Sequence, residues 1–223
     1  MLFKSYTFSF FKPLVASSLA VVLSGGVLSG QDIEVNSDQT QGTITNQGVI
    51  FNDGNQSKKL TLSATNNVIT SITFKNTTLS STNNFLVLNT GKTTITNQVN
   101  VNAEKAIIFD LNNGTELNLA GGISGDGKSR IRILSNGNTT GNGYTATLSG
   151  GSINGMAIEF MGGGTQELKI QNNTANLRSI GMNINGSGDK TLTLDTTSNS
   201  VSASVSDAIS GDLLTLNFEE KAN

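Results

Sequence analysis

Apolar and polar residues alternate in short stretches from about residue 31 to the end of the chain. Most of these stretches are followed closely by Asn, Gly or Ser, which favour turns. None shows a convincing helical period, so the sequence predicts an all-β protein with no composition break that would mark a second domain. The apolar positions of the predicted strands are Val49 to Phe51, Leu60, Leu62, Ile72, Phe74, Phe85 to Leu88, Ile95, Val99, Val101, Ile107 to Phe109, Leu117, Leu119, Ile131, Ile133, Ala146, Leu148, Ile158, Phe160, Leu168, Ile170, Ile180, Met182, Ile184, Leu192, Leu194, Val201, Ala203, Val205, Leu214, Leu216 and Phe218.

Short phrases recur along the alternation. Thr-Ile-Thr-Asn-Gln at positions 43–47 returns unchanged at positions 94–98. Related phrases such as Leu-Thr-Leu stand at positions 59–62, 116–119, 167–170, 191–194 and 213–216. A coil of roughly 22 to 26 residues per turn would produce the spacings between the last four phrases, where the 51 residues from 116 to 167, which also separate the two five-residue phrases, are two turns.

A repeat of this size, with strands and no helices, predicts a parallel β-helix whose turns stack and bury a shared apolar strip. Asn tolerates the left-handed conformation at corners, and stacked side-chain amides can form hydrogen bonds along the coil, while Gly permits tight corners. The alternative is an antiparallel β-sandwich or barrel, which would also contain many short strands.

Residues 1–30 have the layout of a signal peptide. Lys4 and Lys12 precede an apolar stretch at residues 14–23, and small residues follow it. The stretch is shorter than the roughly 20 residues that cross a bilayer, which disfavours a permanent anchor. Cleavage after Gly26 and cleavage after Ser29 both fit. The predicted organisation is therefore a signal peptide at 1–30 and a β-helix domain at 31–223.

Composition removes several classes of chemistry. The chain has no Cys and no His, and residues 31–223 contain 28 Asn but neither Pro nor Trp. Familiar zinc sites and Cys-His or Ser-His-Asp catalytic groups therefore cannot form, and no disulfide stabilises the exported chain. Residues 31–223 carry 12 basic and 16 acidic side chains, a net charge of −4, so nucleic-acid binding has no electrostatic support.

Two motifs match known sites formally. Residues 122–129, Gly-Ile-Ser-Gly-Asp-Gly-Lys-Ser, fit the phosphate-loop pattern, but the alternation of residues 130–134 predicts a strand where a phosphate loop requires a helix. We interpret the segment as a Gly-rich corner. The same glycines and Asp126 partly match a calcium-binding nonapeptide, but the nine-residue recurrence is absent.

Parallel β-helices also include polysaccharide lyases and glycoside hydrolases, which use acidic and basic residues on one groove. The candidates that lie close together in this sequence are Asp110, Glu116, Asp126, Lys128, Arg130 and Arg132. Such charges more often form a solvated face, so we assign no catalytic, cofactor-binding or metal-binding residue. Six Asn-x-Ser/Thr patterns, at Asn55, Asn76, Asn113, Asn138, Asn172 and Asn185, fit N-glycosylation acceptors, although so Asn-rich a chain produces them by chance.

The signal peptide layout, the Leu-Thr-Leu and Ile-Thr-Asn-Gln repeats, and the lack of Cys and His resemble passenger domains of Gram-negative autotransporters, both adhesin-like and vacuolating-cytotoxin-like. The resemblance covers the whole chain. It implies a right-handed parallel β-helix, exported through the inner membrane and displayed at the cell surface or released. The implied role is non-enzymatic adhesion or host interaction, and the implied partner is a host-cell receptor, a glycan or another copy of the chain.

The chain departs from that family because a complete autotransporter continues into a C-terminal membrane β-barrel, which this sequence does not supply. We expect either a fragment or a small secreted protein. The alternative function is that of a carbohydrate-active β-helix acting through residues 110–132. No family active-site motif is present, so the resemblance transfers no catalytic residue.

Overall fold

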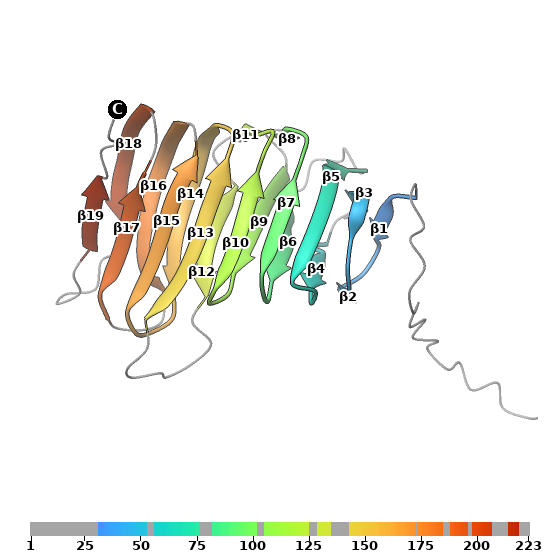
Figure 1. Cartoon of the computed structure of the whole chain (residues 1–223), viewed down its shortest axis with the longest axis horizontal. Helices are drawn as coiled ribbons and strands as arrows, with labels where there is room; N and C mark the ends of the chain where they lie inside the picture. Colours follow the sequence, from blue (N-terminus) through green and yellow to red (C-terminus); the bar gives the residue numbers. More distant parts are fainter. Residues whose placement is uncertain are drawn as a thin grey trace, which may run out of the picture.

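The protein is a right-handed parallel β-helix in a computed structural model. The structure describes residues 31–52, 56–75, 82–101, 105–124, 129–134, 143–172, 174–184, 188–195, 198–206 and 214–218. In these residues the strands form two sheets that face each other as front and back layers in Figure 1. The chain passes from one sheet to the other and back in each coil, so that successive coils stack along one axis.

One of the two sheets, which we call sheet A, contains nine strands in the described residues. In stacking order they are β1 (Ile33–Val35), β3 (Thr45–Phe51), β5 (Asn66–Phe74), β7 (Lys92–Ile95), β10 (Thr115–Leu119), β13 (Tyr144–Gly150), β15 (Gln166–Asn172), β17 (Lys190–Leu194) and β19 (Leu214–Phe218).

The remaining described strands form sheet B. From the C-terminal end they are β18 (Ser198–Ser206), β16 (Thr174–Ile184), β14 (Ile153–Met161), β12 (Arg130–Leu134), β9 (Lys105–Leu111), β6 (Thr82–Leu88), β4 (Lys59–Leu62) and β2 (Gln39–Gln41). Two short strands, β8 (Val99–Asn100) and β11 (Ile123–Ser124), extend this sheet at a corner, where β11 pairs with both β8 and β14.

Every strand pairing between described residues is parallel, which confirms the β-helix and excludes the antiparallel sandwich. All of the apolar positions predicted to lie on strands do so, except Val101, which directly follows β8. Sequence reasoning missed β1, β2 and β11, because strands of two or three residues are too short to show an alternation.

The predicted coil length is correct for most of the chain. Leu168 stacks on Leu192, and Leu192 stacks on Leu216, so two successive coils are equal in length and lie within the predicted range. Leu117 stacks on Leu148, which makes that coil longer than predicted. The longer coil includes residues 135–142, which lie outside the described residues.

The alignment of the two five-residue phrases needs one correction. The repeat pairs Thr43 with Thr94, whereas in the structure Thr45 stacks through Val68 on Thr94. The two copies of Thr-Ile-Thr-Asn-Gln therefore lie two coils apart but are displaced by two positions. Since side chains alternate with a period of two, this displacement keeps the same side chains facing inward.

The related Leu-Thr-Leu phrases also divide between the two sheets. Residues 59–62 belong to sheet B, unlike the phrases at 116–119, 167–170 and 191–194 in sheet A. A shared phrase therefore identifies a strand with an inward apolar face, but not the sheet to which that strand belongs.

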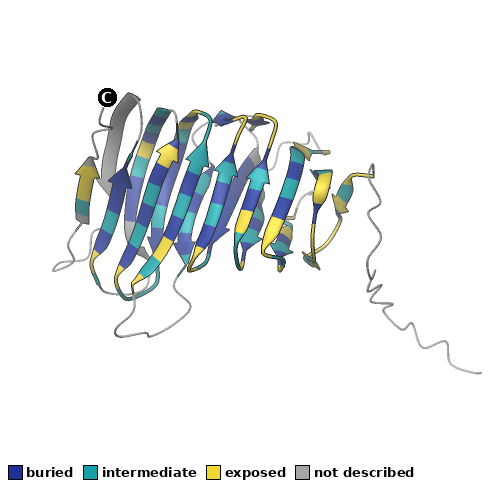
Figure 2. Ribbon diagram, in the orientation of Figure 1, coloured by how far each residue is buried: buried dark blue, intermediate teal, exposed yellow. Residues whose placement is uncertain are grey.

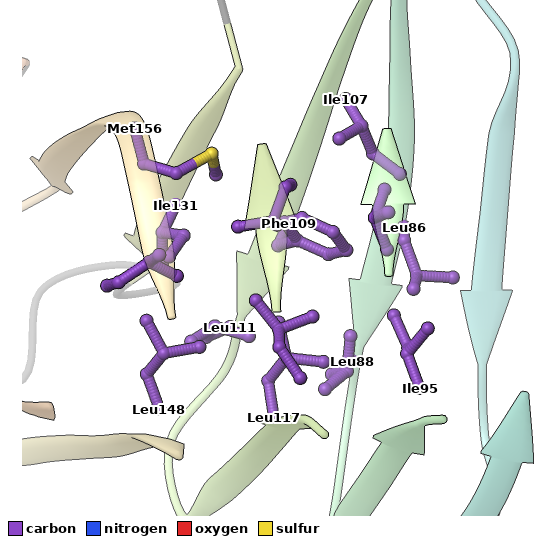
Figure 3. Close-up of a cluster of buried hydrophobic side chains, with 14 of the residues drawn as sticks. Leu86, Leu88, Ile95, Ile107, Phe109, Leu111, Leu117, Ile131, Leu148 and Met156 are labelled. Atoms are coloured by element: carbon purple, nitrogen blue, oxygen red, sulfur yellow. The ribbon is translucent and has the colours of Figure 1, made fainter. Parts of the chain in front are cut away.

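Inward-facing Leu, Ile, Val and Phe side chains fill the space between the sheets. Figure 2 shows buried positions repeating along strand after strand, and Figure 3 shows Leu86 and Leu88 of sheet B among Ile95 and Leu117 of sheet A. These four side chains are fully buried. Burying a side chain of this size contributes roughly 1.5–3 kcal/mol, so the stacked core stabilises a chain that lacks disulfides.

Side-chain amides form the predicted hydrogen bonds between coils. Asn52 donates to Asn36 over 2.8 Å, and Asn112 donates to Asn89 over 2.9 Å. Asn46, with φ of 53°, is the sole non-glycine residue of the described segments in the left-handed region, and it lies at a register shift within β3 rather than at a corner.

Candidate functional site

The outer face of sheet B holds three of the six charged residues singled out in the sequence. Asp110 lies on β9, and Arg130 and Arg132 lie on the adjacent β12. Glu116 lies on β10 in sheet A, so the structure separates it from the other three. Asp126 and Lys128 lie outside the described residues. The structure therefore brings Asp110, Arg130 and Arg132 together on one strand pair and does not bring Glu116 to them.

Asp110 and Arg132 form a bidentate ion pair. They are direct register partners on β9 and β12. Arg132 Nε donates to Asp110 Oδ1 over 2.5 Å, and Nη2 donates to Oδ2 over 2.6 Å. The Asp110 side chain is only 6% exposed and the Arg132 side chain 18%. Two short parallel hydrogen bonds of this kind fix both the distance and the orientation of the pair.

Arg132 also contacts an aromatic ring. Its Cζ lies 5.1 Å from the centroid of Phe85 on β6, the strand on the far side of β9. The guanidinium therefore extends from β12 across β9 to β6. Ile108, the register partner of Phe85 on β9, is 1% exposed. A cation over an aromatic face is attracted by the ring quadrupole, and partial burial strengthens the attraction. Sequence reasoning missed Phe85 because its register with Arg132 was unknown.

The neighbouring charges are paired as well. Arg130 Nε lies 3.2 Å from Glu159 Oε1 on β14, and Lys59 Nζ lies 3.6 Å from Asp38 Oδ2. Gly181 on β16 is the register partner of Glu159. A Cβ at Gly181 would lie 3.5 Å from Glu159 Cγ, so the glutamate side chain extends over the position that the glycine leaves open.

Burial raises the pKa of the Asp110 carboxyl above its ordinary value. Its hydrogen bonds to Arg132, the charge of Arg132 and the charge of Lys59 oppose this shift. Desolvation, which disfavours the ionised carboxylate, outweighs these three opposing effects on the pKa of Asp110. The negative charge of Asp110 is therefore costly to bury, and the charge of Arg132 offsets part of that cost.

Glu116 is held in a separate network on sheet A. Lys92 Nζ lies 2.7 Å from Glu116 Oε1, and Ser149 Oγ donates to the same oxygen over 3.2 Å. A glycosidase needs two carboxyl groups on either side of one bond. Asp110 and Glu116 lie on different sheets and cannot provide that pair. Among the residues that the structure describes, no group of three acidic side chains could hold a metal ion.

Two buried polar side chains on sheet A were not anticipated. Gln166 Nε2 donates to the carbonyls of Met161, over 2.9 Å, and Ile133, over 3.2 Å. Lys190, its register partner one coil away, donates to Gly164 O over 2.6 Å. Both side chains have 0% exposure. Their sequence signal is weak: each stands two residues before an inward-facing Leu, where the alternation predicts an apolar residue.

The segment with the phosphate-loop pattern begins as a corner. Gly122 has φ of 77°, and a Cβ there would lie 2.5 Å from Ser152 O on the next coil. Ser129 is fully buried, and its Oγ accepts a hydrogen bond from Ile107 N over 3.3 Å. Strand β12 follows directly, as predicted, so no helix N-terminus is present there to hold a phosphate. Residues 125–128 lie outside the described residues.

One of the glycosylation patterns is incompatible with the fold. Asn172 is 1% exposed, and its Nδ2, the atom that would carry a glycan, donates to the carbonyls of Ser149 and Gly151. Asn113 lies in an exposed turn and remains accessible. The patterns at Asn55, Asn76, Asn138 and Asn185 lie outside the described residues.

No family model matches the chain, and neither the curated proteins nor the solved structures contain a match to it. Within the described segments, no helix has the length and apolar character that membrane crossing requires.

Proposed function

We propose that the chain is an exported, non-enzymatic surface or secreted protein of the autotransporter-passenger type, acting in adhesion or host interaction. The observation that best supports this proposal is the internal pairing of the charged candidates. Asp110 is bound by Arg132, and Arg130 lies beside Glu159. Side chains that are already ion-paired with each other in this way are poorly placed to act on a substrate, which favours a non-enzymatic role.

The outer face of sheet A offers a repeated polar surface. Thr145, Glu167, Thr191 and Thr215 stack on successive coils, and all four are exposed or half-buried. Strands in a sheet are roughly 4.8 Å apart, so this column presents three hydroxyl groups and one carboxylate at regular intervals. Contacts to such a surface are weak individually, but repetition raises the avidity for a host-cell receptor, a glycan array or another copy of the chain.

Export agrees with the predicted signal peptide at residues 1–30 and with a β-helix that needs no disulfide. We place the protein at the surface of a Gram-negative cell or outside it, associated with the outer membrane. In the complete system, a membrane barrel would then be supplied by further sequence or by another protein. This assignment rests on the resemblance and on the parallel β-helix that the resemblance implies.

A carbohydrate-active β-helix is the second candidate. The observation in its favour is that Asp110, Arg130 and Arg132 share the outer face of one strand pair, and that burial raises the pKa of Asp110. A carboxyl with a raised pKa can serve as a general acid. The reaction would need a second carboxylate. Glu116 lies on the other sheet, so Asp126 is the remaining acidic residue among those singled out in the sequence.

A glycan-degradation assay with and without calcium separates the two functions. The protein from residue 31 onward is incubated with acidic and neutral polysaccharides, in parallel with the Asp126→Ala and Asp110→Asn variants. We expect no product, together with binding to immobilised glycans or host cells that persists in both variants. Sustained degradation that either substitution abolishes would replace the first proposal with the second.

A further inference from the structure

All three arginines of the chain, Arg130, Arg132 and Arg178, lie on sheet B. The first two are on β12 and the third is on β16, with β14 between the two strands (Figure 1). The arginines of β12 alternate with the buried Ile131 and Ile133, so they face outward. A guanidinium presents a planar fork of N–H donors that matches a carboxylate or another oxyanion. The side chains best suited to bind such anions are therefore gathered on one surface.

Arg178 is an extra residue in the register of β16. Its neighbours Leu177 and Ser179 pair with Met156 and Ala157, which are consecutive on β14. Leu177 is buried in the core, whereas Arg178 is exposed. An inserted residue of this kind bends its strand and re-aims a side chain. The register shift therefore leaves Arg178 on the outer face, beside Ser179.

The three guanidiniums differ in how far they are already bound. Arg132 is held by Asp110 through two hydrogen bonds. Arg130 contacts Glu159 through Nε, and its side chain is 38% exposed, so its Nη groups can still donate. No ion pair or hydrogen bond engages the Arg178 side chain in the part of the chain that the structure describes. Arg130 and Arg178 are therefore the two arginines available to a ligand.

The outer face of sheet B is basic, although the chain as a whole has a net charge of −2. The described side chains of its strands include four cations and two carboxylates: Lys59 and the three arginines, with Asp110 and Glu159. The outer face of sheet A has the opposite balance in its described strands, with Glu34, Glu116 and Glu167 against Lys92 and Lys169. A surface of one sign attracts ligands of the other sign. Sheet B therefore favours an anionic ligand.

We propose that the outer face of sheet B binds an acidic glycan across β12, β14 and β16, with Arg130 and Arg178 donating to its carboxylate or sulfate groups. The inference rests on the proposed adhesive function, for which it names a ligand class and a surface. Ala157 is the register partner of both Arg130 and Ser179, so small side chains lie between the two arginines. Ala157 is 3% exposed and does not project from the face. A sugar chain can therefore approach the strands closely at this point.

Other anionic partners fit the same face less well. Duplex nucleic acid carries about one charge per 1.7 Å of its axis, and its affinity depends on neutralising many of them. Two available arginines, on strands roughly 9.6 Å apart, cannot do so. A second copy of the chain would have to present the outer face of sheet A, where Glu116 is paired with Lys92 and Glu34 with Lys75. The spaced acidic groups of a glycan match two separate arginines better.

The test measures binding of the full chain to three immobilised polymers that share one backbone: neutral dextran, carboxymethyl-dextran and dextran sulfate. Arg178→Gln and Arg130→Gln each remove one guanidinium. Lys92→Gln is the matched control, because it removes one positive charge from sheet A. We expect the wild type and Lys92→Gln to bind an acidic polymer but not dextran, and each arginine variant to bind at least ~10-fold more weakly. The two acidic polymers show whether carboxylate or sulfate is the better ligand.

Arg178→Lys separates recognition by the fork from general attraction. Lysine keeps the charge but lacks the planar fork, so we expect its binding to lie between that of the wild type and that of Arg178→Gln. Because Arg178 is exposed, these variants should unfold at the same denaturant midpoint as the wild type. Absence of binding to both acidic polymers, equal binding by the wild type and Arg178→Gln, or tighter binding to duplex DNA than to either polymer would overturn the inference.

Adhesion to host cells, measured on the same variants, keeps this inference apart from the proposed function. Adhesion that persists while neither acidic polymer is bound would reject the acidic-glycan surface and leave the adhesive function standing. Binding to an acidic polymer without any adhesion to cells would reject the adhesive function and leave the surface standing.

Discussion

Asp110 and Arg132 face each other on β9 and β12 and are joined by two hydrogen bonds of 2.5 and 2.6 Å. The pair occupies a position where both side chains are largely shielded from water. Removing one partner from such a pair costs more than the pair contributes, because the remaining charge stays buried and uncompensated.

Arg132→Met is therefore expected to lower the free energy of unfolding by about 3 kcal/mol, measured by denaturant unfolding at neutral pH. Arg130→Met is the matched control. Arg130 is 38% exposed in its pair with Glu159, so solvent screens that interaction and we expect a loss below about 1 kcal/mol. Equal losses of unfolding free energy for the two variants would show that burial does not make the Asp110–Arg132 pair more sensitive to losing a partner than the Arg130–Glu159 pair.

The pKa of Asp110 predicts a pH dependence of stability. A carboxyl whose pKa is raised in the folded state binds its proton more tightly when folded than when unfolded. Its contribution to stability is present at low pH and is lost as the pH rises from the ordinary value of 3.8 through the raised pKa. The wild type should therefore gain stability relative to Asp110→Asn as the pH falls through this window.

Denaturant unfolding of both proteins across the acidic range measures that difference. Glu34 behaves oppositely, because its hydrogen bond and charge interaction with Lys75 lower its pKa, so its contribution is lost as the pH falls. Glu34 is present in both proteins and cancels from the comparison. A wild type that loses stability relative to Asp110→Asn on acidification would contradict the predicted direction.

Gln166 is expected to be structurally essential although it is polar. Gln166→Leu leaves the carbonyls of Met161 and Ile133 without the donor that reaches them, and should cost about 2 kcal/mol of unfolding free energy. Gln171→Leu, on the same strand but exposed, should change stability by no more than about 0.5 kcal/mol. A thermal or denaturant melt compares them, and a neutral Gln166→Leu would mean that the amide is replaceable by packing.

Two glycines separate backbone strain from steric clash. Gly122 and Gly114 both have positive φ, 77° and 72°, but a Cβ at Gly122 would meet Ser152 O at 2.5 Å while one at Gly114 meets nothing within 4 Å. Gly114→Ala should cost about 1 kcal/mol from the left-handed conformation alone. Gly122→Ala should cost at least ~2 kcal/mol because the clash adds to that strain. Equal denaturant midpoints would show that the corner relaxes freely.

The fold was largely predictable because the inward residues repeat with a period of two and recur in each coil. Leu168 and Leu192 lie in related phrases of strand and turn, and their spacing equals one coil. Coil lengths that vary, such as the longer coil from Leu117 to Leu148, could not be read from the alternation. A sequence period indicates which face a residue occupies, but it does not fix which residue lies beside it on the next coil.

The candidate site shows the same limit. Asp110 and Arg132 were both singled out, but their separation in the sequence does not reveal that they are register partners. Glu116 stands closer to Asp110 in sequence than Arg132 does, yet it belongs to the other sheet. The contact of Arg132 on β12 with Phe85 on β6 crosses the strand between them, β9, so predicting it would have required the stacking order of three coils.

Intramolecular crosslinking tests the stacked β-helix most directly. Thr147 and Lys169 are register partners on β13 and β15, and Thr193 lies one coil further on β17. With no native Cys, the double variant Thr147→Cys/Lys169→Cys places two thiols within disulfide range, whereas Thr147→Cys/Thr193→Cys places them two strands, or roughly 9.6 Å, apart. We expect oxidation to close an intramolecular disulfide in the first variant and to leave two free thiols in the second. Free thiols in the first variant, or equal crosslinking of both, would contradict the parallel stacking on which every other inference depends.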